Sequence, residues 1–182
     1  IYLKKVGSKA DVSLGDSCDG YLIDADEKMA RRIITSLREG NRKLAIGDRK
    51  KIGVVGGDDA FNRRIIETLK IDYLVSAEGR TGRGNLKQRD SGLNHVVARM
   101  AKAKGVDIVV DVSLIRNADT EERVVLIERI IQNVKVCRKA GCGLKIASFG
   151  TKGPEVVDEK IRISLGVSFG MSSVQARDSI LF

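Results

Sequence analysis

The sequence predicts an α/β fold in which a parallel, TIM-barrel-like sheet is surrounded by helices. Short apolar segments alternate with amphipathic helical segments, which is the pattern of strand–helix–strand units. Such units place parallel strands in one sheet through right-handed crossovers. The 182 residues hold about seven strands, whereas ordinary barrels of this kind run to about 250 residues. We therefore expect a small, incomplete barrel forming one domain over residues 1–182, with an open doubly wound sheet as the alternative.

The first 50 residues carry the least regular pattern. Tyr21–Asp24 is a short apolar run that predicts a strand, and Glu27–Arg38 repeats apolar residues at helical spacing. Lys43–Ile46 fits either a strand or a connecting loop, and the pattern leaves a strand inside Asp11–Leu14 undecided. One strand and one helix are therefore placed in this part of the chain.

The pattern becomes regular from Lys51 onward. Lys51–Gly56 is a short apolar run, which predicts a buried parallel strand. Ala60–Leu69 places its apolar residues on one helical face, and Ile71–Ser76 predicts the next strand. These segments form a complete strand–helix–strand unit.

A long polar segment separates this unit from the next helix. Leu93–Ala101 has apolar residues spaced as on the buried face of a helix. Asp90 or Ser91 is the expected N-cap, and Gly105 is the expected end. Val106–Val112 is again a buried strand.

The longest helix is predicted after the next connection. Asp119 and Glu122 have the spacing of a capping box, and apolar residues then recur until Gly141 ends the helix. Leu144–Phe149 predicts the strand that follows it.

Two further helices are expected at the end of the chain. Pro154 suits the first turn of one helix, and Gly166 is its expected end. Ser172 or Ser173 is the expected start of the last helix, since serine is a favoured N-cap.

The charge of the chain favours a polyanionic partner. With 33 basic and 24 acidic residues, the formal net charge is +9. An excess of this size indicates nucleic acid as the partner class. Aromatic residues make up only 4% of the chain, which argues against single-strand binding on stacked rings. Contacts to the phosphate backbone are therefore expected to dominate.

The segment from Arg80 to His95 (RTGRGNLKQRDSGLNH) concentrates this charge between a predicted strand and a predicted helix. Its glycines let a large anion approach the backbone closely. Loops that follow the strands of a parallel sheet gather on one face, so cations from several loops meet there. A small-molecule phosphate site on that face is the alternative. The expected RNA-binding residues, all in loops after strands, are Arg80, Arg83, Lys87, Arg89, Arg116 and Lys152.

Residues suited to catalysis are sparse. His95 is the single histidine, and no glycine motif for nucleotide binding is present. Asp58, Glu78 and Asp111 follow strands and offer carboxylates for Mg²⁺, although their spacing does not require it. A stand-alone phosphate- or metal-dependent barrel hydrolase using these four residues is the alternative function. The residues favour binding over chemistry, so we expect no catalytic residue and no metal or cofactor held by the protein itself.

The cysteines and the hydropathy of the chain indicate in which cellular compartment we expect the protein. Cys18, Cys137 and Cys142 form an odd set without zinc-ligand spacing, which fits a reducing cytoplasm. No apolar run approaches the roughly 20 residues that a membrane span needs. We expect a cytoplasmic protein that does not contact membranes.

Four segments are specific enough to be compared with a protein family. They are DSGLNHV (Asp90–Val96), IIQNVKVCRKAG (Ile130–Gly141), LKIASF (Leu144–Phe149) and LGVSFGMSSVQARDS (Leu165–Ser179). In order and spacing, they resemble archaeal ribonuclease P protein component 3, the family of the eukaryotic thirty-kilodalton subunit. The resemblance covers about the last 130 residues, and the first 50 match poorly.

This resemblance implies a barrel-like α/β fold related to the polymerase-and-histidinol-phosphatase metal hydrolases. Those hydrolases bind metals through several histidines, beginning with an H-x-H pair near the N-terminus. This chain has a single histidine and no such pair. The resemblance therefore implies a relative in which the metal-hydrolase activity has been lost.

The resemblance also implies a role as a protein subunit of ribonuclease P, whose RNA removes the 5′ leader from precursor tRNA. The implied partners are the ribonuclease P RNA, protein component 2 and, through the complex, precursor tRNA. Mg²⁺ is expected for the RNA-catalysed reaction, and the isolated chain is expected to be inactive.

Overall fold

In the described part of the chain, six parallel strands form one sheet in which every strand lies beside its neighbours in chain order. The computed structural model describes residues 3–13, 17–79, 90–149 and 157–180. The strands are β1 (Leu3–Val6), β2 (Gly20–Ile23), β3 (Lys51–Val55), β4 (Tyr73–Val75), β5 (Asp107–Asp111) and β6 (Leu144–Ala147). Within the described residues β1 and β6 are not paired with each other, so the sheet has two edges.

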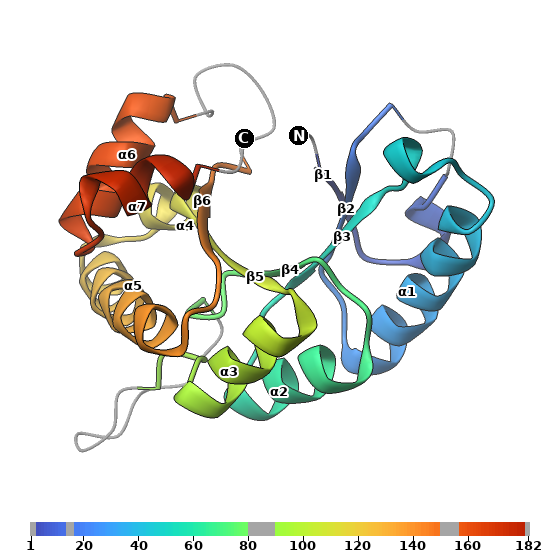
Figure 1. Ribbon diagram of the computed structural model, residues 1–182, viewed down its shortest axis with the longest axis horizontal. Coiled ribbons are helices and arrows are strands. Elements are labelled where there is room, and N and C mark those ends of the chain that lie inside the picture. Colours follow the sequence, from blue (N-terminus) through green and yellow to red (C-terminus); the bar gives the residue numbers. More distant parts are fainter. Residues whose placement is uncertain (1–2, 14–16, 80–89, 150–156, 181–182) are drawn as a thin grey trace.

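Helices follow the strands and cover the outer side of the sheet (Figure 1). They are α1 (Glu27–Asn41), α2 (Asp59–Thr68), α3 (His95–Lys104), α4 (Val112–Asn117), α5 (Thr120–Ala140), α6 (Glu159–Ser168) and α7 (Ser173–Asp178). Two short 3-10 helices, η1 (Lys9–Asp11) and η2 (Ile46–Asp48), lie in the first third of the chain. Strands in sequential order with helices on one side are the arrangement of a TIM-barrel wall, which confirms the predicted fold class.

Residues that alternate along each strand bury two different surfaces. The outer residues of β2 to β5 pack with α1, α2 and α3 in one core cluster, for example Ile23 against Ile33. The inner residues form a separate apolar cluster inside the curve of the sheet. Its members are Leu3, Leu22, Val55, Tyr73, Val75, Val109, Ala147 and Phe149. A filled inner face is the property of a small barrel, whose interior is packed and not a pore.

The end of the chain adds one more position to the sheet. Ile180 forms an isolated parallel bridge to Ile146 of β6, immediately after α7. The backbone N–H of Ile146 donates to the carbonyl of Ser179 at 2.7 Å. The six strands and this bridge agree with the expectation of about seven strands.

Several local predictions were wrong, and each has a physical reason. Helix α3 begins after Asn94, not after Asp90 or Ser91, because the Asn94 side chain accepts from the N–H groups of Val96 and Val97. Ser91 is instead buried, and its hydroxyl donates to the carbonyl of Leu93 at 3.2 Å. Gly105 ends the helix in the left-handed region, as expected.

The sequence patterns did not predict two elements, β1 and α4. Strand β1 contains two adjacent lysines, Lys4 and Lys5, so it lacks a continuous apolar run. The sequence predicted a loop where α4 lies. Asp111 is both the last residue of β5 and the N-cap of α4, so no connecting residue separates the strand from the helix. Lys43–Ile46 is not a strand but leads into the turn of η2.

The predicted end of α6 was also wrong. Gly166 lies inside α6, where an added Cβ would be 2.9 Å from Cδ1 of Ile146. The glycine therefore lets α6 approach β6 closely instead of ending the helix. Pro154, predicted in the first turn of this helix, lies outside the described residues.

Candidate nucleic-acid interface

The two edges at which the strands begin and end carry opposite charge among the described residues. All strands run in the same direction, so helices start near the carboxyl edge of the sheet and end near its amino edge. Acidic N-caps or first-turn residues occupy the carboxyl edge: Asp26, Glu27, Asp58, Asp59, Asp111, Asp119, Glu121, Glu122, Asp158 and Glu159. These carboxylates satisfy free N–H groups and interact favourably with the helix dipoles.

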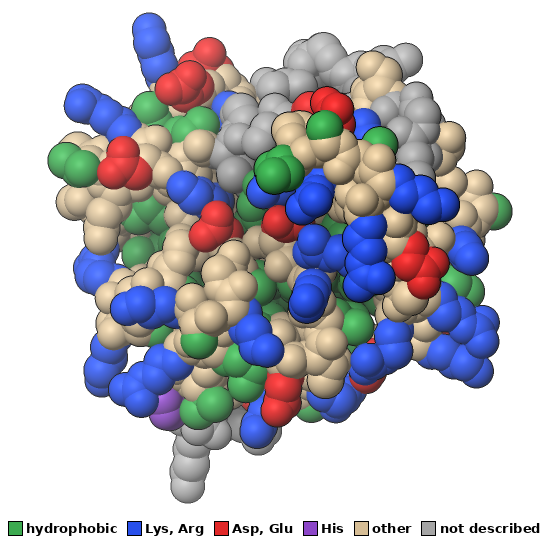
Figure 2. Space-filling model, turned by 45° about the vertical axis from the view of Figure 1, so that its right-hand side comes forward, with side chains coloured by type: hydrophobic (Ala, Val, Ile, Leu, Met, Phe, Trp, Pro, Cys, Tyr) green, Lys and Arg blue, Asp and Glu red, His purple; other side chains and the backbone are tan. Residues whose placement is uncertain are grey.

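Basic residues occupy the last turns of three of the helices. The last-turn cations of α1, α3 and α5 are Arg38, Lys102, Lys104, Arg138 and Lys139. Cations at helix C-termini interact favourably with the dipole, which is the physical reason for the pattern. Figure 2 shows lysine and arginine side chains spread over one face of the molecule, with acidic side chains scattered between them.

Of the six residues expected to bind RNA, the structure describes Arg116. It is exposed on α4, at the carboxyl edge, and its carbonyl accepts from Nη2 of Arg123 at 3.4 Å. The other five, which are Arg80, Arg83, Lys87, Arg89 and Lys152, lie outside the described residues. The predicted grouping of these cations therefore stays a prediction.

The described residues on either side of residues 80–89 are joined by a buried polar side chain. Asn133 of α5 donates to Oε2 of Glu78 at 3.3 Å and to the carbonyl of Ser91 at 3.2 Å. Arg129, one turn earlier, donates to the carbonyl of Glu78 at 3.1 Å. Helix α5 thus holds Glu78 and Ser91, which flank the part of the sequence that contains most of the predicted RNA contacts.

Glu78 itself is enclosed by the protein. Its side chain is 1% exposed, and burial raises its pKa to about 7, with the nearby charge of Asp111 acting in the same direction. A carboxyl group with this pKa changes its charge near neutral pH. The base of the loop therefore contains a group whose ionisation is coupled to folding.

A second buried amide fixes the same region from α2. Asn62 donates to the carbonyls of Gly57 and Gly92 at 3.0 and 2.8 Å, and its Oδ1 accepts from the N–H of Gly57 at 2.8 Å. Asn94 then donates to both carboxylate oxygens of Asp59, at 2.7 and 2.8 Å. Sequence reasoning missed the two buried amides. The available signal was an asparagine inside an apolar helical stripe.

Of the four residues assigned to the alternative hydrolase, three form hydrogen bonds that stabilise the fold and the fourth is exposed. Asp58 and Asp111 are N-caps that accept from Phe61 and Ser113, respectively. Glu78 is bonded to Asn133, and His95 is an exposed first residue of α3. Within residues 3–13, 17–79, 90–149 and 157–180, no group of three or more His, Cys, Asp or Glu side chains is placed to hold a metal ion. The described donor set differs from the multi-histidine metal centre that the resemblance attributes to the related hydrolases.

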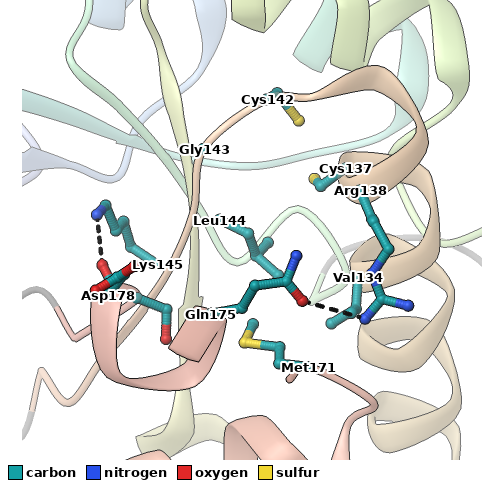
Figure 3. A pocket seen from close by; sticks show the side chains of 11 residues that line it. Val134, Cys137, Arg138, Cys142, Gly143, Leu144, Lys145, Met171, Gln175 and Asp178 are labelled. Atoms are coloured by element: carbon teal, nitrogen blue, oxygen red, sulfur yellow. Dashed lines mark hydrogen bonds between the residues drawn. The ribbon is translucent and has the colours of Figure 1, made fainter. Parts of the chain in front are cut away.

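A cavity of about 230 Å³ lies near the amino edge, between α5, β6 and α7 (Figure 3). Arg138 donates to the carbonyl of Gly170 and to Oε1 of Gln175, and Lys145 donates to the carbonyl of Asp178 at 2.8 Å. Both cations are thus already bonded within the protein. The other residues that line the cavity include Val134, Cys137, Cys142, Leu144 and Met171.

Comparison with known proteins identifies the relatives of this chain. No family model matches it. Ribonuclease P protein component 3 of Thermococcus gammatolerans is 32% identical over 129 residues, covering 71% of this chain and 56% of the relative. This chain is a relative of ribonuclease P protein component 3. The same protein of Thermococcus kodakarensis is 30% identical over 129 residues, covering 71% of this chain and 55% of that relative.

More distant component 3 proteins match as well. The one of Methanococcus maripaludis strain S2 is 22% identical over 151 residues, covering 79% of this chain and 60% of its own length. The chain therefore spans little more than half the length of the component 3 relatives that it matches. The resemblance inferred from the sequence is confirmed.

Solved structures show the same fold. A chain in the cryo-EM structure of archaeal ribonuclease P with mature tRNA matches with a TM-score of 0.67 at 18% identity, covering 88% of this chain and 65% of that one. The crystal structure of an uncharacterized protein matches with a TM-score of 0.60 at 8% identity, covering 90% of this chain and 42% of that protein. At these identities the matches establish the fold, which is the one expected for a component 3 relative.

Among the described residues, no helix is both long and apolar enough to span a membrane.

Proposed function

We propose that this chain acts as a protein subunit of ribonuclease P and supports the catalytic RNA that removes the 5′ leader from precursor tRNA. The observation that carries this proposal is the 32% identity to ribonuclease P protein component 3 over 129 residues. The net charge of +9 provides independent support, because a polyanionic RNA is the partner that such a charge favours.

In this function the protein contributes electrostatics and not bond cleavage. Lysine and arginine side chains would neutralise phosphates where RNA helices crowd together, which lowers the concentration of Mg²⁺ needed for the active RNA fold. A-form RNA exposes its phosphates and 2′-hydroxyls more readily than its base edges, so recognition would follow shape. The cations assigned to this task are Arg80, Arg83, Lys87, Arg89, Arg116 and Lys152.

The remaining parts of the proposed assembly are those that the family resemblance implies. Protein component 2 and the ribonuclease P RNA are the proposed partners, precursor tRNA is bound through the complex, and the cytoplasm is the proposed compartment. Mg²⁺ belongs to the RNA-catalysed reaction in this scheme, with no cofactor held by the protein.

Reconstitution tests this function. Precursor tRNA is incubated with ribonuclease P RNA and component 2, with and without the purified chain, over a series of Mg²⁺ concentrations. We expect the chain to lower the Mg²⁺ concentration at which the mature 5′ end appears. The chain alone with Mg²⁺ should leave precursor tRNA intact. No effect on the Mg²⁺ requirement would contradict the proposal, and cleavage by the chain alone would favour the stand-alone hydrolase.

A further inference from the structure

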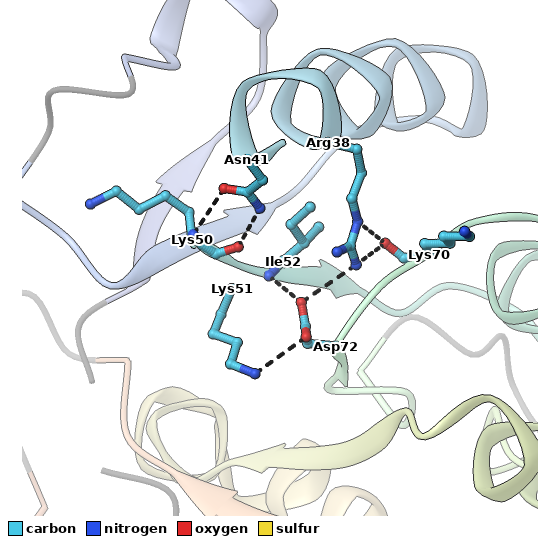
Figure 4. Close-up of polar contacts among 7 residues, drawn as sticks. All are labelled: Arg38, Asn41, Lys50, Lys51, Ile52, Lys70 and Asp72. Carbon is cyan, nitrogen blue, oxygen red and sulfur yellow. Dashed lines mark hydrogen bonds and ion pairs between the residues drawn. The ribbon is translucent and has the colours of Figure 1, made fainter. Parts of the chain in front are cut away.

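Six cations gather at the amino edge of β2, β3 and β4, on the side of the sheet opposite to the predicted RNA-binding loop. They come from the end of α1, the start of β3 and the residues before β4. Figure 4 shows part of this group and the bonds that hold it. We call it the amino-edge cluster, which consists of Arg38, Arg42, Lys43, Lys50, Lys51 and Lys70.

Hydrogen bonds bring these separate segments together. The side chain of Asn41, the last residue of α1, donates to the carbonyl of Lys50 at 2.8 Å and accepts from its N–H at 2.9 Å. Arg38 donates from Nε to the carbonyl of Lys70 at 2.8 Å. The end of α1 is therefore fixed against both β3 and the segment that enters β4.

The carboxylate of Asp72 is shared by two cations of this cluster and a backbone N–H group. Oδ2 of Asp72 accepts from the N–H of Ile52 at 2.9 Å and lies 3.6 Å from Nη2 of Arg38. Oδ1 of Asp72 lies 3.4 Å from Nζ of Lys51. Asp72 thus stabilises the turn into β4 and compensates only part of the positive charge around it.

Three members of the cluster keep an uncompensated charge. Arg42, Lys43 and Lys70 are exposed, and no carboxylate of the described residues lies within ion-pair distance of them. Glu39 and Asp48 are exposed in the same part of the chain, so the acidic residues present there are fewer than the cations. The amino edge therefore presents positive charge to solvent.

Some cations on the outer faces of α1 and α2 have acidic partners. Arg64 and Arg31 contact Glu27 at 2.7 and 3.2 Å, and Arg63 lies 3.9 Å from Glu67. These charges are compensated by neighbours on the helices. Within the amino-edge cluster, Arg42, Lys43 and Lys70 lack such a partner among the described residues.

We propose that the amino-edge cluster binds backbone phosphates of a structured RNA, as a second contact distinct from the predicted loop at the carboxyl edge. This inference rests on the proposed function, because the ribonuclease P RNA is its ligand. Phosphates are the groups that exposed lysine and arginine side chains neutralise in RNA, and such contacts need no aromatic platform. Contacts of this kind carry little sequence information and depend strongly on salt.

The experiment compares two variants that each lose three positive charges. Arg42→Gln, Lys43→Gln and Lys70→Gln are combined in an edge variant. A control variant combines Arg32→Gln, Arg99→Gln and Lys135→Gln, which are exposed positions in the middle of α1, α3 and α5. Each protein, with component 2 present, is titrated onto fluorescently labelled ribonuclease P RNA over a series of salt concentrations.

We expect the slope of log affinity against log salt to become shallower by about 2 in the edge variant, since each lost phosphate contact removes roughly 0.7–0.9. The control variant should keep the wild-type slope to within about 0.5. Equal slopes for the two variants would overturn the inference while leaving the proposed function intact. An edge variant that binds RNA normally but no longer binds component 2 would also overturn it. Absence of RNA binding by the wild-type chain would instead contradict the proposed function itself.

Discussion

The carboxyl and amino edges of the sheet use their polar residues in different ways. At the carboxyl edge, buried amides and a buried carboxyl group hold the backbone, as Asn62, Asn133 and Glu78 do. At the amino edge, the cations of the amino-edge cluster are mostly exposed, and half of them have no acidic partner among the described residues. The polar groups named at the carboxyl edge therefore serve stability, whereas the amino edge combines such bonds, as at Asn41, with exposed charge that is available for binding.

This difference leads to a general expectation about substitutions. Changes at the carboxyl edge should lower the free energy of unfolding, because buried polar groups lose their partners. Changes of exposed cations at the amino edge should alter RNA affinity and leave the free energy of unfolding nearly unchanged. The following experiments test the comparison, from the largest expected effect to the smallest.

The largest effect is expected from Glu78. Its pKa is about 7 in the folded protein and 4.5 in an unfolded chain, so the folded state binds more protons between these values. The free energy of unfolding should therefore fall as pH rises from 4.5 to 7, by about 3 kcal/mol at roughly 1.4 kcal/mol per pKa unit, and level off above 7.

Glu78→Gln removes this titration while keeping the shape of the side chain. Urea unfolding of both proteins at pH values from 5 to 8 should show the variant gaining stability relative to the wild type as pH rises. Other titrating groups are common to both proteins and cancel in the difference. Parallel pH profiles would show that Glu78 is ionised in the folded state over this whole range.

A large effect on stability is also expected at one position of the amino edge, where the backbone and not a charge is involved. A Cβ at Gly20 would lie 2.3 Å from the backbone oxygen of Lys51, so Gly20→Ala should separate β2 from β3. We expect a loss of about 2 kcal/mol or more in urea unfolding, as for other overpacked sites. Gly47→Ala is the matched control, because nothing lies within 4 Å of its Cβ.

Asn62→Ala should cost about 2 kcal/mol, because the carbonyl of Gly92 and both backbone groups of Gly57 lose a partner. Since Gly92 precedes α3, amide hydrogen exchange near Leu93 should become faster as well. Asn117→Ala, at an exposed position, should change neither quantity. Unchanged exchange in the Asn62 variant would show that this amide does not hold the segment before α3.

The smallest effect tests whether RNA approaches the carboxyl edge. Asp58→Asn keeps an N-cap oxygen for Phe61 but removes a negative charge, so stability should change little. If RNA contacts this edge, affinity at low salt should rise by about threefold, as expected for one charge a few ångströms from a phosphate. An unchanged affinity would indicate that this edge faces away from the RNA.

Much of the fold could be predicted because its signals are local. The stop signals Gly105 and Gly141 and the Asp119 cap were all placed correctly. Prediction failed where a residue has two roles, or where its role depends on a contact with a residue far away in the sequence. Asp111 ends a strand and caps a helix, and Gly166 makes room for Ile146. Such requirements depend on packing partners that the local pattern does not contain.

The candidate site was predicted only in part for the same reason. The basic segment was found from its composition, and Arg116 lies at the expected edge. The acidic N-caps around that edge and the amino-edge cluster were not foreseen. Arg38, Lys51 and Asp72 are far apart in the sequence, and the pairing of β3 with β4 and the position of the end of α1 bring them together.

The sequence by itself determined the order of strands and helices, most of the helix ends, the excess of positive charge and the relationship to ribonuclease P protein component 3. These properties follow from local periodicity, capping chemistry and composition, which any stretch of chain carries with it. The tertiary structure alone decided which cations share an edge, which amides hold the base of the loop, and why Glu78 has a pKa of about 7. Each of these depends on burial and on contacts between distant residues, and those exist only once the sheet and its helices have packed together.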